Sequence, residues 1–486
     1  MTLIVGTLLP HSPLIAFSVI ICIGTGYIIY QRCFHPLAKY PGPALASLSG
    51  LWRAYHIYCL DLHEKILQAH RRHGPIVRIG PNHLHFWNAQ AVAPIYKSGR
   101  KMPKTDFYDA FTAFRPNLFG GRDEDIHSSR RRQLSHGFSQ ASIQKMESII
   151  EIQIEILIKK LQRFAKTHEI FDLKEVISFY VLDILGEVAF GRPFEAQSAD
   201  TVPEINAIND HLLLAGIIGS LPCQGLLKAA ANWSPVPWMR RLIQSRAKLK
   251  QTCSDCVESK RSMQGESRLD MMQHLLSATD PKTGMKLNDD EIKSEAFAML
   301  VAGSHSTAGT TVLLFWHLLH NPKTLAKVEQ EIKDVLGDLP EDKIAYPIAG
   351  LEASLDYTRS CVQENFRITP VFNMCLWRST HVAISNHALH HNPDIWGIDD
   401  EAFVPDRFMG LEGKAMLQSL IPFSIGHRMC IGRNLGLTNL WKTVTTLLNR
   451  FDFETISPDR PVRVESSGIG ELRGSFLCRV ALKKGE

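Results

Sequence analysis

The sequence predicts a mainly α-helical fold with small β-sheets, in one large domain that follows an N-terminal transmembrane helix. Long segments place apolar residues at helical spacing, whereas strand-like stretches such as "PIVRIG" and "HLHFW" are short and few. No internal repeat and no second linker divides the rest of the chain. With 486 residues, of which 45% are hydrophobic, the chain can bury the sizeable core that such a domain needs.

The amino-terminal segment is apolar and carries no charged residue before Arg32. Residues 14–30 read "LIAFSVIICIGTGYIIY", which is close to the roughly 17 to 25 residues that cross a bilayer. Arg32 and Lys39 follow, and under the positive-inside rule they keep the rest of the chain in the cytosol. A cleaved signal peptide is the alternative, but a basic first region and a clear small-residue cleavage site are both missing. We therefore expect a membrane anchor over residues 1–31.

A proline-rich linker is predicted over residues 32–43, which include "FHPLAKYPGP". Its prolines cannot continue a helix and favour a stiff, extended chain. We therefore expect the anchor to be mechanically separate from the body, which comprises residues 44–486.

Charge and cysteine usage argue against other classes of protein. A net charge of +5 is small for this length, and the basic residues are scattered apart from Arg130 to Arg132, so nothing favours nucleic-acid binding. The 10 cysteines are unevenly spaced, which does not indicate a disulfide framework, and a cytosolic body would keep them reduced. Cys253 and Cys256 form a CxxC pair, but no second pair accompanies it, so we interpret it as incidental.

Three segments show clear helical periodicity: residues 143–164, 173–190 and 292–319. The last has defined ends, because Asn288 and Glu291 form a capping box pattern and Asn321 is followed by Pro322. A helix of about thirty residues, rising ~1.5 Å per residue, crosses the full width of a domain.

The middle of this helix reads "AGSHSTAG", residues 302–309, and is small and hydroxylic within an otherwise apolar segment. A glycine inside a helix costs about 1 kcal/mol relative to alanine. Either a flat group presses against the helix there or a neighbouring helix packs closely, and both readings are open.

Cys430 lies in the stretch "FSIGHRMCIG", between Gly426 and Gly432. A thiolate is a strong ligand for iron, but a cysteine stays ionised only beside positive charge or a helix amino terminus. Both are predicted here, since Arg428 is close and the following "IGRNLGLTNLWKTVTTLLNRF" is an amphipathic helix. The two glycines allow backbone N–H groups to turn towards the sulfur. Any other cysteine is more often a small buried hydrophobe.

The chain resembles the cytochrome P-450 monooxygenases from its anchor to its carboxyl end. "FSIGHRMCIG" fits their FxxGxRxCxG haem-binding loop at every fixed position, and "ENFR" and "FVPDRF" match their ExxR and FxPxRF segments in the expected order. The resemblance implies the cytochrome P-450 fold, haem b as cofactor and Cys430 as the iron ligand. It also implies cofactor contacts from three residues of the loop: Phe423, Arg428 and Gly432.

Glu364 and Arg367 lie three positions apart and therefore on the same face of a helix. The resemblance adds Arg407, from "FVPDRF", as the third member of a buried Glu-Arg-Arg set. A buried carboxylate between two guanidiniums can be satisfied by bidentate hydrogen bonds, and such a set would support the cysteine loop.

By the same resemblance, the long helix crosses the oxygen-binding face of the haem, and "AGSHST" stands where the family has (A/G)Gx(D/E)T(T/S). His305 replaces the usual acidic residue and Ser306 replaces the usual threonine. Serine keeps a hydroxyl that can hold a water, and histidine can relay protons near neutral pH. We therefore expect Ser306, His305 and Thr307 to manage protons, with catalysis retained but altered.

The segment "HSSRRR" resembles the WxxxR position of the family, with His127 in place of tryptophan and Arg131 one helical turn further on. The resemblance implies that both residues reach a haem propionate, and that Arg378, after ExxR, binds a propionate as well. A solvated helix face is the alternative, and it fits Arg130 and Arg132 better than Arg131.

The largest departure follows Arg378, where only "STHVAIS" precedes "NHALHHNPDIWG". The family normally inserts a β-hairpin there. The short segment either displaces a strand beside the substrate pocket or reflects a gene model that omits coding sequence.

These features predict a haem-thiolate monooxygenase that inserts one oxygen atom from O2 into an apolar small molecule. Electrons would come from an NADPH-dependent flavin reductase. The style of "FHPLAKYPGP" and "RRRQLSHGFS" resembles fungal microsomal members, which implies secondary-metabolite biosynthesis at the endoplasmic reticulum membrane, with a single span and a cytosolic catalytic domain. The expected pocket residues are Phe297, Leu300, Val301 and the segment from Val371 to Leu376. Two alternatives stay open: a haem-thiolate isomerase or dehydratase that needs no O2, and a degenerate relative without enzymatic activity.

Overall fold

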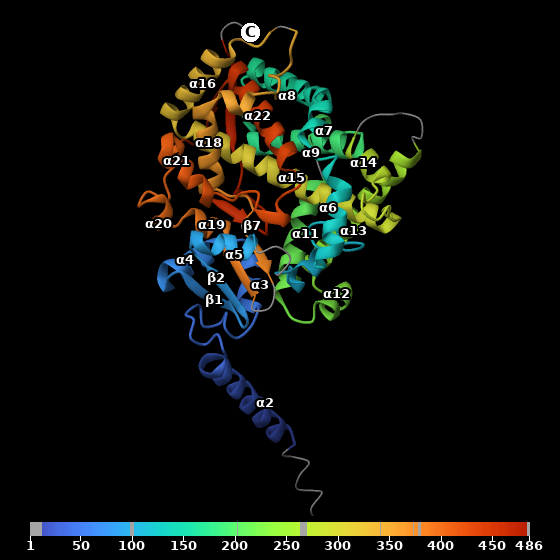
Figure 1. Cartoon of the computed structure of the whole chain (residues 1–486), viewed down its shortest axis with the longest axis vertical. Helices are drawn as coiled ribbons and strands as arrows, with labels where there is room; N and C mark the ends of the chain where they lie inside the picture. The colour runs from blue at the N-terminus through green and yellow to red at the C-terminus, as the bar shows by residue number, and fades with distance from the viewer. Residues whose placement is uncertain are drawn as a thin grey trace, which may run out of the picture.

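Helices form most of the body, and the sheets are small (Figure 1). The computed structural model of the chain describes residues 12–97, 102–201, 203–262, 270–340, 342–372, 374–377 and 381–483. The helices are α2 (Ser12–Ile29), α3 (Leu51–Tyr58), α4 (Leu62–His73), α5 (Val92–Tyr96), α6 (Glu124–Ser135), α7 (Gln140–Lys145), α8 (Glu147–Thr167), α9 (Leu173–Leu185), α10 (Ala196–Ala199), α11 (Pro203–Ser220), α12 (Gln224–Asn232), α13 (Pro237–Ser262), α14 (Met271–Ser277), α15 (Asp289–Leu319), α16 (Pro322–Leu336), α17 (Leu351–Ser354), α18 (Asp356–Ile368), α19 (Asn386–His390), α20 (Pro393–Trp396), α21 (Gly410–Met416) and α22 (Arg433–Arg450). The strands are β1 (Ile76–Gly80), β2 (His83–Phe86), β3 (Phe171–Asp172), β4 (Met374–Trp377), β5 (His381–Ser385), β6 (Phe451–Thr455), β7 (Val464–Ser466), β8 (Gly470–Leu472) and β9 (Leu477–Leu482).

The long helix α15 runs through the middle of the body and contacts α9, α13, α18 and α22 (Figure 1). Its predicted capping box is present, because Glu291 N donates to Asn288 Oδ1 at 3.0 Å and Asn288 N donates to Glu291 Oε2 at 2.9 Å. The helix ends at Leu319, and Pro322 begins α16. The central position of α15 allows it to border both the core and a cavity.

The two glycines of α15 lie where neighbouring elements approach the helix closely. A Cβ on Gly303 would come within 2.8 Å of Leu185 Cδ1 on α9, and one on Gly309 would come within 2.9 Å of the Gly470 carbonyl oxygen at β8. Close packing therefore accounts for both glycines, although Gly303 also borders the cavity described below.

The main core lies where α8, α9, α15, α16, α18 and α22 meet. The side chains at its centre are buried, including Leu157, Ile177, Phe315 and Trp441. Because α22 begins directly after the Cys430 loop, this core fixes the position of that loop.

The principal sheet has four strands in the order β1-β2-β5-β4. The predicted strands "PIVRIG" and "HLHFW" form its antiparallel β1-β2 pair, and β2 runs parallel to β5. Strand β4 pairs directly with β5, from Met374 opposite Ser385 to Trp377 opposite Val382. The short segment after Arg378 therefore leaves both strands in the sheet, while Arg378 itself lies outside the described residues.

Helix α2 projects away from the body, and its apolar residues 14–29 are exposed (Figure 1). Together with the π-helical turn Tyr30–Phe34, it is long and apolar enough to cross a membrane. Helix α15 passes the same test of length and composition, but it is largely buried inside the body.

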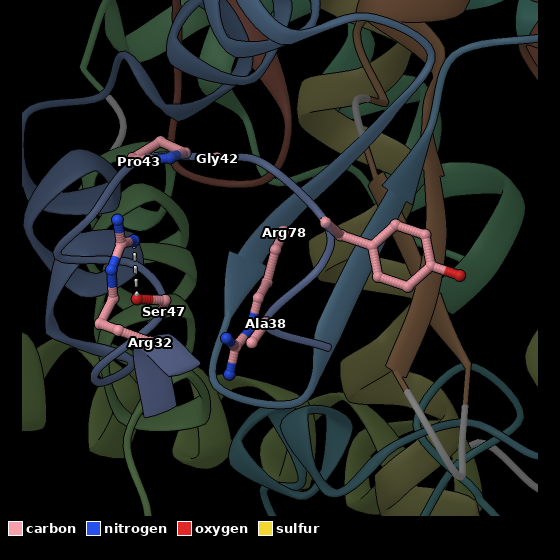
Figure 2. A pocket seen from close by; sticks show the side chains of 7 residues that line it. Arg32, Ala38, Gly42, Pro43, Ser47 and Arg78 are labelled. Carbon is pink, nitrogen blue, oxygen red and sulfur yellow. Dashed lines mark hydrogen bonds between the residues drawn. The ribbon is translucent and has the colours of Figure 1, made fainter. Parts of the chain in front are cut away.

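Hydrogen bonds join the end of the helical segment to β1, at the place where the sequence predicts a mechanically separate anchor. Arg78 donates to the Gln31 carbonyl oxygen and to Gln31 Oε1, both at 2.7 Å, and its backbone N–H donates to the Pro41 carbonyl oxygen at 2.7 Å. Nearby, Arg32 donates to Ser47 Oγ at 3.5 Å (Figure 2). Arg78 and Gln31 are buried, so the guanidinium needs the acceptors that this junction supplies.

Candidate functional site

A cavity of about 390 Å³ lies between α15 and the loop that precedes α22. Most of its walls are apolar side chains. The residues of α15 that border it include Ala302, Gly303, Ser306 and Thr307, and the loop contributes Phe423, Arg428, Cys430 and Gly432. The cavity therefore brings together most of the residues that the sequence assigned to cofactor and proton chemistry.

The backbone of the loop holds Cys430 so that its side chain is exposed to the cavity. Cys430 N donates to the Phe423 carbonyl oxygen at 2.9 Å, and Met429 N donates to the Gly426 carbonyl oxygen at 3.1 Å. Gly426 has a φ of +76°, and a Cβ there would lie 2.3 Å from the Tyr96 carbonyl oxygen. Only glycine fits this turn.

Two opposing effects act on the ionisation of the Cys430 thiol. Burial within the protein raises the pKa of the thiol, while the backbone N–H groups of Gly432 and Arg433 and the charges of Arg131 and Arg433 lower it. Helix α22 begins at Arg433, so the predicted helix start lies beside the sulfur. These donors and cations are the groups that stabilise a thiolate bound to a metal.

Arg428 borders the cavity, but its guanidinium is paired with Glu124 at the start of α6. It donates to Glu124 Oε1 at 2.6 Å and to the Gly121 carbonyl oxygen at 2.8 Å. His427 Nε2 donates to Glu124 Oε2 at 2.8 Å. Glu124 was not predicted, because it lies 304 positions from Arg428 and nothing local in the sequence links the two.

His127 and Arg131, both on α6, border the cavity as expected. Arg131 donates to the Met429 carbonyl oxygen at 2.7 Å, which ties α6 to the cysteine loop. His127 is buried, and its Nδ1 has no hydrogen-bond partner among the described residues. Burial lowers the pKa of His127, and the charges of Arg428 and Lys104 lower it further, so the ring is neutral. Lys104, which the sequence did not indicate, also borders the cavity.

The neighbouring arginines of α6 do not form a solvated face. Arg130 is buried and pairs with Glu291 at 2.6 Å and Glu295 at 3.2 Å. Arg132 pairs with Asp280 at 2.7 Å. These ion pairs hold α6 against α15 and the segment after α14, and so fix the helix that carries His127 and Arg131.

The three predicted proton-handling residues of α15 lie in different surroundings. Ser306 and Thr307 border the cavity, and Ser306 Oγ donates to the Ala302 carbonyl oxygen at 2.6 Å. His305 is not among the residues that border the cavity. Consecutive helix positions point about 100° apart, so neighbours in sequence need not share a face.

The His305 side chain is buried on the side of α15 that faces β8. Its Nδ1 lies 3.1 Å from Ser304 Oγ, and its Nε2 has no hydrogen-bond partner among the described residues. Burial lowers the pKa of His305 to about 4, so the imidazole is neutral near pH 7.

The predicted pocket residues divide in a similar way. Phe297, Val301 and Val371 border the cavity, and Phe372 joins them. Leu300 is fully buried in a core cluster instead. The side chains from residue 373 to residue 376 lie outside the described part of the chain.

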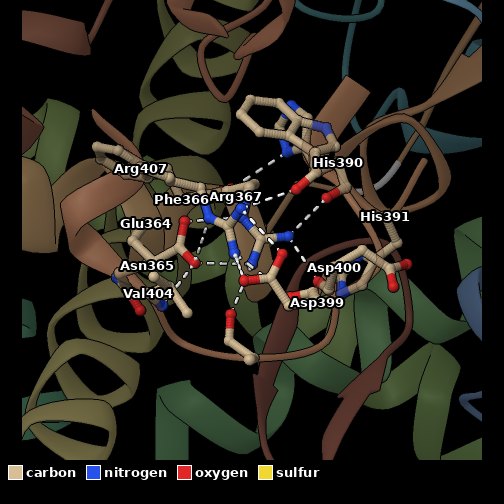
Figure 3. Close-up of polar contacts among 12 residues, drawn as sticks. Glu364, Asn365, Phe366, Arg367, His390, His391, Asp399, Asp400, Val404 and Arg407 are labelled. Atoms are coloured by element: carbon tan, nitrogen blue, oxygen red, sulfur yellow. Dashed lines mark hydrogen bonds and ion pairs between the residues drawn. The ribbon is translucent and has the colours of Figure 1, made fainter. Parts of the chain in front are cut away.

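Glu364, Arg367 and Arg407 form one buried ion-pair network (Figure 3). Arg367 donates to both carboxylate oxygens of Glu364, at 2.7 and 2.8 Å, and Arg407 Nε donates to Glu364 Oε1 at 3.0 Å. Other guanidinium N–H groups donate to the backbone carbonyls of His390, Asp400, Ala402 and Trp396, and Arg407 also pairs with the Asp399 carboxylate at 3.3 Å. The network therefore joins α18 to the chain around α19 and α20.

The cavity fits the haem that the sequence predicts on two grounds. Its apolar walls contain a cysteine sulfur that is exposed to the interior, which suits an apolar macrocycle with a thiolate ligand. Arg131 and Lys104 border it too, and their charges act on His127, whose Nδ1 has no hydrogen-bond partner among the described residues. Two cations and an imidazole suit the acidic groups of a haem.

Comparison with known proteins gives a family match and a set of relatives. A family model described as Cytochrome P450 matches residues 41–473. Cytochrome P450 monooxygenase poxM of Penicillium oxalicum is 27% identical, over 89% of this chain and 87% of the relative. Cytochrome P450 monooxygenase tpeC of Talaromyces stipitatus is 30% identical, over 88% and 86%. Benzoate 4-monooxygenase bphA of Aspergillus niger is 27% identical, over 91% and 90%.

Proposed function

The chain belongs to the cytochrome P450 family, and from this premise we propose that it inserts one oxygen atom from O2 into an apolar small molecule. The family binds haem through a cysteine thiolate, and Cys430 is the residue that we assign to the iron. The observation that carries this assignment is the shared cavity, in which Cys430 on one element and Ser306 and Thr307 on another border the same space.

Thiolate-ligated haem activates O2 and supplies an oxidant that can attack an unactivated C–H bond. The chain contributes the ligand and its support. The N–H groups of Gly432 and Arg433 favour the ionised sulfur of Cys430. His127 and Arg131 would bind the acidic edge of the haem, and Phe423, which packs edge-on against Phe366, would contact its apolar face.

We assign proton handling to the hydroxyls of Ser306 and Thr307. A hydroxyl has one donor and two acceptor lone pairs. Ser306 Oγ uses its donor on the Ala302 carbonyl, so its lone pairs can accept from a water in the cavity. His305 lies outside the cavity and is neutral near pH 7, so a direct proton relay through its ring is not part of this assignment.

The substrate is proposed to be apolar because the cavity is lined mainly by apolar side chains, such as Phe297, Val301 and Val371. The fungal relatives named as monooxygenases support the reaction class. We also propose that the protein receives its electrons from an NADPH-dependent flavin reductase. Its product would belong to fungal secondary metabolism.

The location is proposed from the amino-terminal segment. Residues 1–31 would anchor the chain in the endoplasmic reticulum membrane with a single span, residues 32–43 would link it to the body, and residues 44–486 would form the cytosolic haem domain. The exposed apolar surface of α2 and the positive charges that follow it support this arrangement.

The proposal is tested with microsomes that contain the full-length chain. We expect the reduced, carbon-monoxide-treated sample to show the strongly red-shifted Soret band of a thiolate-ligated haem. The Cys430→Ser variant should lose it, and the Cys59→Ser variant, at an exposed cysteine, should keep it. Product formation should require both NADPH with a flavin reductase and O2. Turnover that needs neither would contradict the monooxygenase assignment.

A further inference from the structure

A second group of metal-ligating side chains lies between α4 and α19, on elements that carry no residue assigned to haem binding. His63 and Glu64 occupy the first turn of α4, and His387 lies on the short helix α19, which packs against α4. One ligand atom from each residue lies within 4.8 Å of the other two. Residues more than three hundred positions apart are thus brought together.

The three side chains lie close together, and His387 forms an ion pair with Glu64. His387 Nε2 lies 3.3 Å from Glu64 Oε1, and His63 Nε2 lies 3.8 Å from the same oxygen. Both imidazole nitrogens are buried and have no hydrogen-bond partner among the described residues. Buried polar atoms normally make well-directed hydrogen bonds, so two ring nitrogens that lie near one carboxylate without them suit a bound ion.

The spacing matches a tetrahedral metal site. Zinc binds histidine nitrogen and carboxylate oxygen at about 2.0 to 2.2 Å, which places neighbouring donor atoms roughly 3.3 Å apart. The Glu64 to His387 distance is 3.3 Å, and the Glu64 to His63 distance of 3.8 Å needs only a small side-chain rotation. Two histidines and one glutamate also form a donor set that zinc sites with an open fourth position use.

The surroundings of the three residues suit a cation. The Glu64 side chain is 48% exposed, which gives an ion access from solvent. His391 Nδ1 donates to the His387 carbonyl oxygen at 2.8 Å and steadies that turn.

We propose that His63, Glu64 and His387 bind one divalent transition-metal ion, with Zn²⁺ as the preferred ion and water at the fourth position. The ion would clamp α4, which packs on β1, to α19, which packs on α18. The ion would therefore join the sheet near the anchor to the helix that carries Glu364 and Arg367. It stands independently of the proposed monooxygenase activity.

Zinc binding to the haem-loaded, full-length chain tests the proposal. After dialysis against a chelator, titration with ZnCl2 at neutral pH should give one ion per chain, while MgCl2 should give no comparable binding, because magnesium prefers oxygen ligands. The His63→Ala and His387→Ala variants should each weaken zinc binding by about ten-fold or more. His73→Ala, on the same helix α4, should leave it unchanged. No zinc binding, or wild-type affinity in the first two variants, would overturn the proposal.

Two further measurements distinguish the loss of the zinc site from a general failure of the variants to fold. Glu64→Gln changes a half-exposed residue, so it should keep the red-shifted haem spectrum and still weaken zinc binding. X-ray absorption at the zinc edge of the wild-type protein should show a shell of imidazole nitrogen and oxygen. A shell that contains sulfur would place the ion at cysteines and reject this site. Because His63 also borders the large cavity, enzymatic activity is not used as a readout.

Discussion

At the scale of single residues, the cysteine loop depends on a carboxylate that belongs to another element. Glu124 accepts hydrogen bonds from both His427 and Arg428, the two residues that follow Gly426 in the loop. The side chains of Glu124 and Arg428 are only 9% and 3% exposed, so this pair is shielded from water. Arg428, which borders the cavity, is therefore held by a partner at the start of α6.

Replacing Glu124 with glutamine should destabilise the protein and weaken haem retention. A buried cation that loses its partner typically costs about 3 kcal/mol or more, because the guanidinium of Arg428 stays buried without its counter-charge. Denaturant unfolding monitored by circular dichroism, together with the haem-to-protein ratio after purification, measures both effects. Asp125→Asn, at an exposed position of the same turn, is the control. Equal stability of the two variants would mean that Glu124 does not hold the loop.

Replacing Ser306 with alanine should lower the yield of product per NADPH consumed by at least about ten-fold, because a positioned proton-transfer group typically contributes 10²- to 10⁴-fold. The measurement compares product formed with NADPH oxidised in the reconstituted system. His305→Gln alters a neighbour outside the cavity and should keep the wild-type yield. If the yield of product per NADPH falls strongly in the His305 variant and little in the Ser306 variant, then His305 is the proton relay.

At the scale of elements, the junction of α2 with β1 couples the anchor to the sheet. Arg78 is buried in β1 and donates to two oxygen atoms of Gln31. A hydrogen-bonded junction of this kind would orient the body relative to the membrane, which an extended linker would not. The sheet itself is complete on its β4 side, because β4 pairs with β5 although the segment between them is short.

Two deletions that differ at this junction should separate membrane release from stability. Removal of residues 1–25 keeps Gln31, whereas removal of residues 1–31 leaves Arg78 without two of its acceptors. Both should release the protein partly from membranes and retain haem. The longer deletion should be less stable by roughly 1 to 3 kcal/mol, the cost of buried polar groups without partners. Complete loss of haem in both would show that the anchor is needed for the body to fold.

At the scale of the whole molecule, many histidines among the described residues are buried in the body. Burial lowers the pKa of each of these: His63, His70, His83, His85, His127, His211, His305, His317, His390 and His391. Each ring is neutral in the folded state and takes up a proton on unfolding below its ordinary pKa. Their contributions have the same sign, so they add.

The protein should therefore be sensitive to mild acid. Since the unfolded chain binds more protons than the folded chain below about pH 6.5, the free energy of unfolding should fall as the pH drops from 6.5 towards 4. Equilibrium unfolding at a series of pH values gives the slope. His317 is buried, and its Nε2 is hydrogen-bonded to Thr369 Oγ1 at 3.2 Å. The His317→Gln variant should reduce the dependence of the unfolding free energy on pH. A flat profile between pH 6.5 and 5 would contradict this prediction.

The sequence by itself determined the features that depend on neighbours along the chain. The capping box of α15, the helix start beside Cys430 and the pairing of Glu364 with Arg367 all follow from spacings of a few residues. Backbone geometry places such neighbours together in any helix, so local rules were sufficient. The haem-binding loop was recognisable for the same reason, because its ligand and its turn residues lie within one short stretch.

The tertiary structure decided which distant residues meet and which way each side chain faces. Glu124 joins Arg428, Gln31 joins Arg78, and His63 meets His387 only because elements from separate parts of the chain pack together. His305 and Ser306 are adjacent in sequence, yet only Ser306 borders the cavity. Packing sets these contacts, because the rotation of a helix about its axis is chosen by the core that it buries, and a sequence pattern read locally does not contain that rotation.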